Sequence, residues 1–315
     1  MNKLICIGEC LIDFLPMNND GVSYIAKAGG APANVCASVA KLGGEAYYLG
    51  KLSTDSFGQF LLSAIKDCGV NTDFVQFCQN NTALAMVTLD KNGDRKFAFY
   101  RENTADLLLD KAEISEDMFE CGDVLHFCSV GLVESPTKYA HERAIELARA
   151  KGAKVSFDVN VRLGLWQSEE LCKSAIKQFL AYADIVKVTD EELQLITEEK
   201  EEILAVSELL KMSPNAQIIF VTKGKNGATV YDRTLDNFTR NAVDVKVVDT
   251  TGAGDCFSGG ILFKLLQGTA KLNLSDMRDA VDFASYACGV VIGKKGAMQA
   301  MPTYQEVINL KKSMQ

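Results

Sequence analysis

Short strand-like runs and longer helix-like runs alternate along most of this 315-residue chain. The strand-like runs are apolar and rich in β-branched residues: KLICIGE, EAYYLG, DVLHFCS, AKVSFDV, DIVKV and QIIFVTKG. Between them lie runs with helical spacing of apolar residues, such as PANVCASVAKLGG, SFGQFLLSAIKDCG and KYAHERAIELARAKG. Several of these end in glycine, the usual C-terminal cap. The alternation predicts an α/β fold with a mainly parallel central sheet and helices on both faces.

One segment, TALAMVTLDKNGDRKFAFYR, breaks this alternation. Apolar and polar residues alternate on both sides of Asn92-Gly93, a strong signal for a tight β-hairpin. We expect a small β-sheet lid made from segments at about 13–28 and 82–104, projecting over the strand ends. No linker, low-complexity tract or internal repeat interrupts the sequence, so residues 1–315 are expected to form a single domain with this appendage.

Charge and cysteine usage exclude several classes of partner. The formal net charge is −8, and no run of basic residues offers a surface for a phosphate backbone, so nucleic acid is not expected. The ten cysteines form no C-x-x-C pair and fit reduced thiols in a cytoplasm. The apolar run in MNKLICIGECLIDF soon meets Glu9 and Asp13, which argues against a signal peptide or a membrane span. We therefore expect a cytoplasmic protein with no membrane partner.

A glycine-rich stretch joins the strand-like VKVVDT to the helical pattern CFSGGILFKLLQG. Gly252, Ala253 and Gly254 leave their backbone open, and free N–H groups at a helix start form an anion site. Asp255 would lie beside an anion held there, which suits a base that orients a hydroxyl between them. We expect the helix end to keep it ionised and only weakly basic. The alternative is that Asp255 complements the helix dipole.

Two long motifs in this sequence resemble the signatures of the ribokinase-like, or PfkB, family of sugar kinases. DTTGAGDCFSGG is similar to the C-terminal signature, and GGAPANVCASVAKLGG is similar to the N-terminal one. GECLIDF, FAFYRENTADLLL, FDVNVRLGLW, VKVTDEEL and KKGAMQAMPT are similar to segments of fructokinases within that family. The resemblance implies a ribokinase-like fold and ATP-dependent phosphorylation of fructose at its 6-hydroxyl. It also implies that Asp255 is the base and that the Gly252–Gly254 backbone forms the anion hole.

The resemblance places the sugar site near the first strand. Asp13 can accept hydrogen bonds from sugar hydroxyls, Gly29 and Gly30 allow close approach of the backbone, and Asn34 can both donate and accept. Without the resemblance, the glycines read equally well as an ordinary turn and Asn34 as a helix cap.

Two arginines and two phenylalanines are further candidates at the sugar end. By resemblance, Arg101 reaches the sugar from the lid and Arg162 lies near the transferred phosphate, although a lone arginine is more often a solvated surface residue. Phe97 and Phe99 share one face of the hairpin strand and are expected to pack over the sugar and exclude water, with ordinary core packing as the alternative.

The same resemblance supplies a nucleotide and ion site. Its nucleotide-binding candidates are Lys187, Thr189, Glu192, Thr222, Lys223, Gly224, Gly227 and Ser285. Thr189 and Ser285 stand where relatives often have asparagine. Glu192 is expected to hold Mg²⁺ through water, because this ion keeps several waters and takes few protein ligands. Candidate ligands for a monovalent cation such as K⁺ are Asp249 and Thr251, with backbone oxygens near Val291, Lys294, Gly296 and Ala300.

The sequence leaves alternatives open. A kinase for 2-keto-3-deoxygluconate or another PfkB sugar kinase is the nearest one, with Arg101 facing a carboxylate. The second alternative is a family member that binds a sugar without catalysing its phosphorylation. With any of these functions, two copies could form a homodimer through the lid strands. A histidine-based hydrolase is not expected, because His126 reads as a core residue, His141 as part of a surface helix, and no nucleophile elbow is present.

Overall fold

The computed structural model describes residues 2–17, 23–89 and 95–314, so the predicted Asn92-Gly93 turn lies outside the described residues. Within these ranges a nine-stranded sheet has the order β13-β12-β11-β10-β9-β8-β1-β4-β5. Its strands are β1 (Leu4–Ile7), β4 (Ala46–Ser53), β5 (Val75–Cys78), β8 (Val124–Cys128), β9 (Lys154–Asp158), β10 (Ile185–Thr189), β11 (Ile218–Thr222), β12 (Ala228–Asp232) and β13 (Asn237–Arg240). Pairing is parallel from β5 to β11, and β12 and β13 are antiparallel additions.

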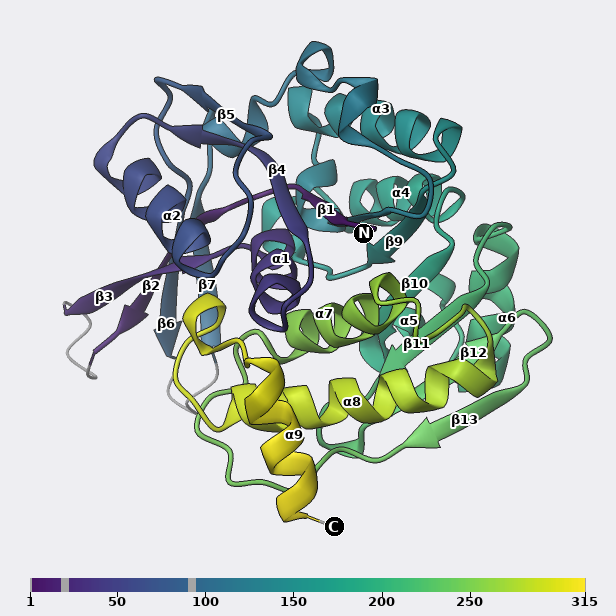
Figure 1. Cartoon of the computed structure of the whole chain (residues 1–315). Helices are drawn as coiled ribbons and strands as arrows, with labels where there is room; N and C mark the ends of the chain where they lie inside the picture. Colours follow the sequence, from purple (N-terminus) through teal and green to yellow (C-terminus); the bar gives the residue numbers. More distant parts are fainter. Residues whose placement is uncertain (1, 18–22, 90–94, 315) are drawn as a thin grey trace.

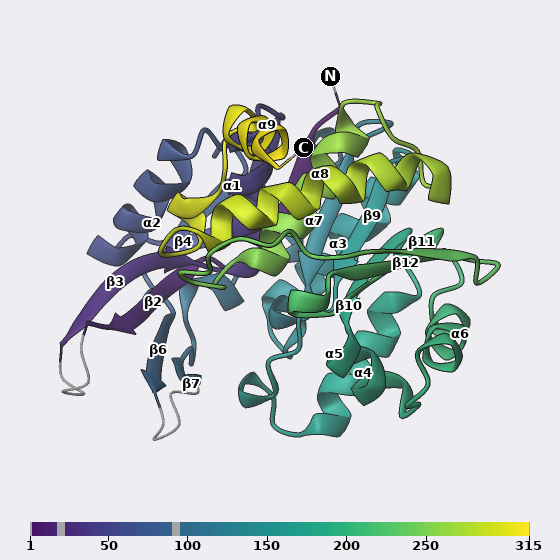
Figure 2. The same cartoon turned by 90° about the horizontal axis from the view of Figure 1, so that it is seen from below.

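Helices cover both faces of this sheet, as Figure 2 shows from below. One face carries α1 (Ala31–Lys41), α2 (Ser56–Asp67), α7 (Ala253–Leu266), α8 (Leu274–Ile292) and α9 (Tyr304–Ser313). The other carries α3 (Pro136–Ala150), α4 (Glu169–Leu180), α5 (Asp190–Thr197) and α6 (Glu202–Met212). The predicted α/β architecture is therefore confirmed.

Strand β1 shows why the sheet strands are apolar throughout. Leu4 and Cys6 belong to the hydrophobic core beneath α1, α7 and α8, whereas Ile5 and Ile7 belong to the core beneath α3 and α4. All four side chains are fully buried. A strand covered on both faces buries successive residues in opposite directions, which produces a continuous apolar run.

A separate four-stranded sheet has the order β3-β2-β6-β7 and projects from the body (Figure 1). Its strands are β2 (Leu11–Pro16), β3 (Tyr24–Gly29), β6 (Leu84–Leu89) and β7 (Arg95–Tyr100). We call it the lid sheet. Strands β2 and β3 overlap the two ends of the segment expected at 13–28, and β6 and β7 lie within the segment expected at 82–104.

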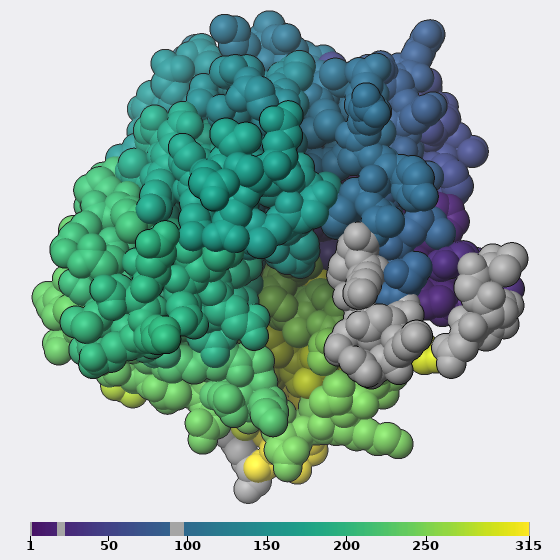
Figure 3. Space-filling model, turned by 180° about the vertical axis from the view of Figure 1, so that it is seen from behind, coloured from purple at the N-terminus to yellow at the C-terminus, as the bar shows by residue number. Residues whose placement is uncertain are grey.

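The carboxyl ends of the parallel strands and the lid sheet border one region of the molecule. From behind, the space-filling surface is hollowed beside the lid, with yellow-green chain from the C-terminal part at its floor (Figure 3). In open α/β sheets, ligands bind outside the carboxyl ends of the strands. A ligand site is therefore expected at this hollow.

Candidate active site

Helix α7 begins at the Gly-Ala-Gly-Asp stretch. Gly252 precedes it with a φ of 79°, a left-handed conformation that favours glycine. Within the described residues, the backbone N–H groups of Gly252, Gly254 and Asp255 donate to no other protein atom, whereas Ala253 N donates to Thr250 O over 3.2 Å. Free donors therefore meet the positive end of a fourteen-residue helix, a suitable anion site.

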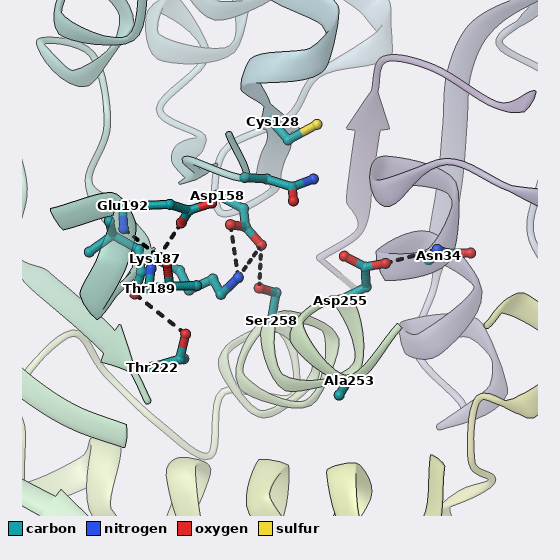
Figure 4. Close-up of polar contacts among 12 residues, drawn as sticks. Asn34, Cys128, Asp158, Lys187, Thr189, Glu192, Thr222, Ala253, Asp255 and Ser258 are labelled. Carbon is teal, nitrogen blue, oxygen red and sulfur yellow. Dashed lines mark hydrogen bonds and ion pairs between the residues drawn. The ribbon is translucent and has the colours of Figure 1, made fainter. Parts of the chain in front are cut away.

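The carboxylate of Asp255 points from the first turn of α7 towards α1 (Figure 4). There Nδ2 of Asn34 donates a hydrogen bond to Oδ2 of Asp255 over 2.8 Å, although the two residues are 221 positions apart. The buried Oδ1 of Asn34 has no hydrogen-bond partner among the described atoms. The amide thus orients the carboxylate while keeping an acceptor for another hydrogen-bond donor.

Burial raises the pKa of Asp255 to about 6, because the charged form loses hydration. The hydrogen bond from Asn34 lowers this pKa, the charge of Asp158 raises it, and Lys187 and Arg162 lower it. Burial therefore makes Asp255 a stronger base than we expected from the sequence. At neutral pH the group is mostly ionised, and it is a stronger base than an exposed aspartate.

A buried ion pair lies beside the start of α7. Nζ of Lys187, in β10, is 3.0 Å from both carboxylate oxygens of Asp158 at the end of β9, where the two residues pair across the strands. Ser258 Oγ donates to Asp158 Oδ2 over 3.4 Å (Figure 4). A Cβ at Gly254 would lie 3.1 Å from Lys187 Nζ, so the ammonium adjoins the free amides.

The residues expected at the sugar end lie together where the lid meets α1. The carboxylate of Asp13 in β2 lies against Gly29 in β3, since a Cβ on Gly29 would be 2.1 Å from Asp13 Oδ2. Gly30 has a φ of 111°, and a Cβ there would be 2.4 Å from the carbonyl oxygen of Glu9. Its own carbonyl accepts from the N–H of Asn34 over 2.9 Å. A side chain at position 29 or 30 would therefore clash with these neighbouring atoms, which explains why both residues are glycine.

The arginine expected to reach the sugar is largely engaged within the protein. Nε of Arg101 is 2.6 Å from Asp106 Oδ2, and Nη1 donates to the Val130 carbonyl over 2.8 Å. Its buried Nη2 has no partner among the described residues and is left for a ligand. Arg101 and Phe99 line a cleft of about 510 Å³ below the lid, and the Phe97 side chain lies outside the described part of the chain.

Glu192 fixes the segment that carries the second arginine. Its Oε2 accepts from Thr189 N over 2.9 Å in a capping box at the start of α5, and its Oε1 accepts from Val161 N over 2.7 Å. Arg162 follows, exposed, with Nη1 donating to the Val161 carbonyl over 2.8 Å. Each carboxylate oxygen of Glu192 keeps a lone pair that a water can use.

A second cavity, of about 610 Å³, opens between the β11–β12 turn, α8 and the start of α7. Apolar side chains such as Val243, Val247 and Ile292 form much of its wall. The candidate nucleotide-binding residues that line it are Lys187, Thr189, Thr222, Gly224, Gly227 and Ser285. Ala253 and Gly254 line it as well, so an apolar slot runs into the anion site. This arrangement suits a flat base with a phosphate tail.

Two of the nucleotide candidates direct their polar atoms elsewhere. Nζ of Lys223 is 2.7 Å from both Glu202 Oε1 and Thr229 Oγ1, and the residue does not line the cavity. Ser285 lines the cavity, but its hydroxyl donates to the Val281 carbonyl one turn earlier over 2.7 Å. The β11–β12 turn therefore lines the cavity with the backbone of Gly224 and Gly227. Helix α8 lines it without offering the Ser285 hydroxyl proton to a ligand.

The loop before α7 is tied to the loop after α8. Oδ1 of Asp249 accepts from the amide and hydroxyl of Thr251 over 3.0 and 2.6 Å, and its Oδ2 accepts from Gly296 N over 3.1 Å. Three cation-site candidates thus lie together next to the anion site. The Val291 carbonyl accepts from Lys294 N over 3.0 Å, and Ala300 is buried in the 3₁₀ turn Met298–Ala300.

Comparison with known proteins identifies the family. Residues 1–304 match the family described as pfkB family carbohydrate kinase. The chain belongs to this family. Fructokinase-2 of Solanum habrochaites is 39% identical over 318 residues, which cover 98% of this chain and 96% of that protein.

Solved structures of fructokinases share the fold of this pfkB-family chain. Fructokinase of Xylella fastidiosa with bound ATP superposes with a TM-score of 0.91 at 32% identity, covering 99% of this chain and 98% of that one. Fructokinase of Vibrio cholerae O395 with fructose, ADP and calcium also has a TM-score of 0.91, at 30% identity, covering 98% and 99% of the two chains. The ribokinase-like fold is thereby confirmed, and the chain is a phosphotransferase that acts on a sugar hydroxyl.

Several polar residues of the site in this pfkB-family kinase were not predicted from the sequence. Asp158 and Ser258 were not singled out, and neither was Glu9, whose Oε1 accepts from Ala31 N over 3.0 Å and whose pKa burial raises to about 7. Asp158 could have been predicted as a site residue, because it is a charged residue at the carboxyl end of an apolar strand, where ligands bind in such sheets. The expected helix around His141 is α3, which lies on the outside of the sheet, but His141 is on its inner face and fully buried, with Nδ1 2.7 Å from the Thr137 carbonyl.

Across the described ranges, the helices are all too short or too polar to cross a membrane.

Proposed function

We propose that this chain transfers the γ-phosphate of ATP to the 6-hydroxyl of fructose. The observation that carries the proposal is the position of Asp255, which is held 2.8 Å from the Asn34 amide and has free backbone donors in the same helix turn. The Asp255 carboxylate, as a base, therefore lies next to an anion site. Transfer of a phosphoryl group to an alcohol requires both. The fructokinase names of the relatives support the choice of sugar.

In this mechanism Asp255 orients the sugar hydroxyl and accepts its proton as the oxygen attacks the γ-phosphorus, while the bond from that phosphorus to the β–γ bridging oxygen breaks and ADP leaves. The free amides of Gly252, Gly254 and Asp255 donate to the phosphate oxygens and stabilise the charge that spreads over them. Arg162 is exposed at the mouth of the site and forks onto the same phosphate when the site closes.

The sugar is held between the body and the lid. Asp13, the backbone of Gly29 and Gly30, and Asn34 bind its hydroxyls, while Arg101 and Phe99 contact it from the lid side. The lid excludes water, which limits hydrolysis of ATP.

The nucleotide occupies the slot that ends at Gly254. No group of three His, Cys, Asp or Glu side chains able to hold a metal is present in the described ranges. We propose that Mg²⁺ enters with the ATP phosphates and that Glu192 contacts it through water, because Mg²⁺ takes few protein ligands. K⁺ is proposed at the loop of Asp249, Thr251 and Gly296, near the carbonyls of Val291, Lys294 and Ala300.

The experiment that tests the proposal is a sugar panel. Purified protein with ATP and Mg²⁺ is given fructose, ribose, glucose or 2-keto-3-deoxygluconate, and ADP formation is measured together with the position of the new phosphate ester. Fructose 6-phosphate as the main product is the expected result. Preferred turnover of the keto acid would move the chain to the alternative kinase, and no turnover of any sugar would support a binding protein.

The pH dependence of kcat/KM tests the Asn34–Asp255 contact. Since activity needs the ionised base, kcat/KM should fall about tenfold per pH unit below about 6 in the wild type. Asn34→Ala removes a hydrogen bond that lowers the pKa of Asp255, so the acid limb should move to higher pH. Ser38→Ala, four residues along the same buried helix face, is the matched control and should keep the wild-type limb. An unmoved limb in Asn34→Ala would contradict the contact.

We also propose that two copies associate through their lid sheets. Ile25 of β3 and Tyr100 of β7 are 42% and 63% exposed on the two outer strands of the lid sheet, and outer strands can pair with a second chain. Sedimentation should give a dimer for the wild type and a monomer for Tyr100→Glu, whereas Tyr139→Glu on α3 should leave the dimer intact. A monomeric wild type would refute this proposal.

A further inference from the structure

The ion pair of Lys187 and Asp158 is costly for the fold. The two side chains are 10% and 2% exposed, and they lie on adjacent central strands whose neighbouring residues are apolar. Removing two charges from water costs several kcal/mol each, and apolar residues at such positions often give equal or better stability. Stability therefore does not explain why two buried strands carry these charges.

The position of the pair points to catalysis. Lys187 Nζ adjoins the anion site at Gly254, where a Cβ would lie 3.1 Å from the ammonium, and Lys187 lines the nucleotide cavity. Asp158 is set back from that cavity, holds the ammonium through both oxygens at 3.0 Å, and accepts from Ser258 on α7. Figure 4 shows this chain of contacts running from β9 and β10 to α7, next to Asp255.

We propose that Asp158 is a positioning residue for phosphoryl transfer, which holds the Lys187 ammonium at the amides of α7 so that this cation stabilises the transferred phosphate. The inference rests on the proposed kinase function. A fixed cation requires no reorganisation when charge develops in the transition state, whereas a mobile lysine would. Ser258 in turn links the pair to the helix that carries the base.

The charges of Asp158 and Lys187 also shift the pKa of Asp255. The Asp158 charge raises the pKa of Asp255, and the Lys187 charge lowers it. The charged and titratable groups that face Asp255 are Asp158 on β9, Lys187 on β10, Arg162 after β9, Cys6 on β1 and the neighbouring Cys256 on α7. Loss of the Asp158 charge should therefore lower the pKa of Asp255. It removes a charge that raises this pKa and leaves the Lys187 charge, which lowers it, uncompensated.

Asp158→Asn tests the proposal through two readouts. We expect kcat to fall about 10- to 100-fold, with KM for the sugar within about threefold, and the acid limb of kcat/KM to move to lower pH. Asp123→Asn is a matched control: Asp123 pairs with Lys3 over 3.0 Å at 3% and 11% exposure, just before β8 and therefore at the amino end of the parallel strands. Asp123→Asn should change neither kcat nor the acid limb of kcat/KM. An Asp158→Asn enzyme with wild-type kcat and an unmoved limb would overturn the proposal.

A second variant covers the case in which Asp158→Asn does not fold. Asp158→Asn combined with Lys187→Met leaves neither member of the ion pair charged without its partner, and its kcat should be about 100-fold or more below wild type. A kcat within threefold of wild type would overturn the proposal. The assays use fructose, or the panel sugar that is phosphorylated if fructose is not, so a wrong sugar assignment is distinguishable from a wrong role for Asp158.

Discussion

Asp255→Asn should reduce kcat by about 10²- to 10⁴-fold while the protein stays folded, because the amide cannot accept a proton from the sugar hydroxyl. The replacement keeps the shape of the side chain and its contact with Asn34. Thermal stability should match or exceed that of the wild type, since burial of the charged carboxylate is unfavourable, as its raised pKa indicates. Coupled assay of ADP release and thermal denaturation measure the two effects.

A matched control separates catalysis from helix electrostatics. Asp276 also lies in the first turn of a helix, α8, where it accepts a backbone hydrogen bond from Lys271 over 3.0 Å. Asp276→Asn should leave kcat within about twofold of wild type. If Asp255→Asn kept more than a tenth of wild-type kcat, Asp255 would be a complement to the helix dipole, as Asp276 is.

Gly254→Val should reduce kcat by about 10²- to 10³-fold, the loss expected when an anion-hole donor is removed. The new side chain would cover the free amide at residue 254 and press on the Lys187 ammonium, because a Cβ there lies 3.1 Å from Nζ. Affinity for ADP should change little, since the γ-phosphate subsite is the part affected. Steady-state kinetics and calorimetric titration with ADP measure both.

Gly254→Ala provides a graded control for this prediction. A single methyl group at that contact would displace the Lys187 ammonium by a few tenths of an ångström, less than valine would, so the loss of kcat should be intermediate. Equal activity in the alanine and valine variants and in the wild type would show that this amide is not used.

The sequence predicted those parts of the site that are encoded locally. Gly252 and Asp255 lie within a few residues of each other, so a strand-turn-helix reading places the amides and the carboxylate together without any knowledge of the fold. The two-sheet architecture followed from the same kind of local evidence, because apolar runs with different periods identify strands and helices independently.

Contacts between distant segments could not be read in the same way. The pairing of Asp158 with Lys187 depends on the register of two neighbouring strands, and the engagement of Arg101 by Asp106 depends on how the lid joins the body. The raised pKa of Asp255 comes from burial by surrounding elements, which has no signal at the residue itself. The burial of His141 could not be predicted for the same reason, since packing of α3 decides it.

The most direct test of the account is a crystal structure with fructose and a non-hydrolysable ATP analogue bound. The account predicts that an Asp255 carboxylate oxygen lies within hydrogen-bonding distance of the sugar 6-hydroxyl, while the amides of Gly254 and Asp255 donate to the γ-phosphate group. A sugar whose 6-hydroxyl faces another residue, or a γ-phosphate group that makes no contact with these amides, would contradict it.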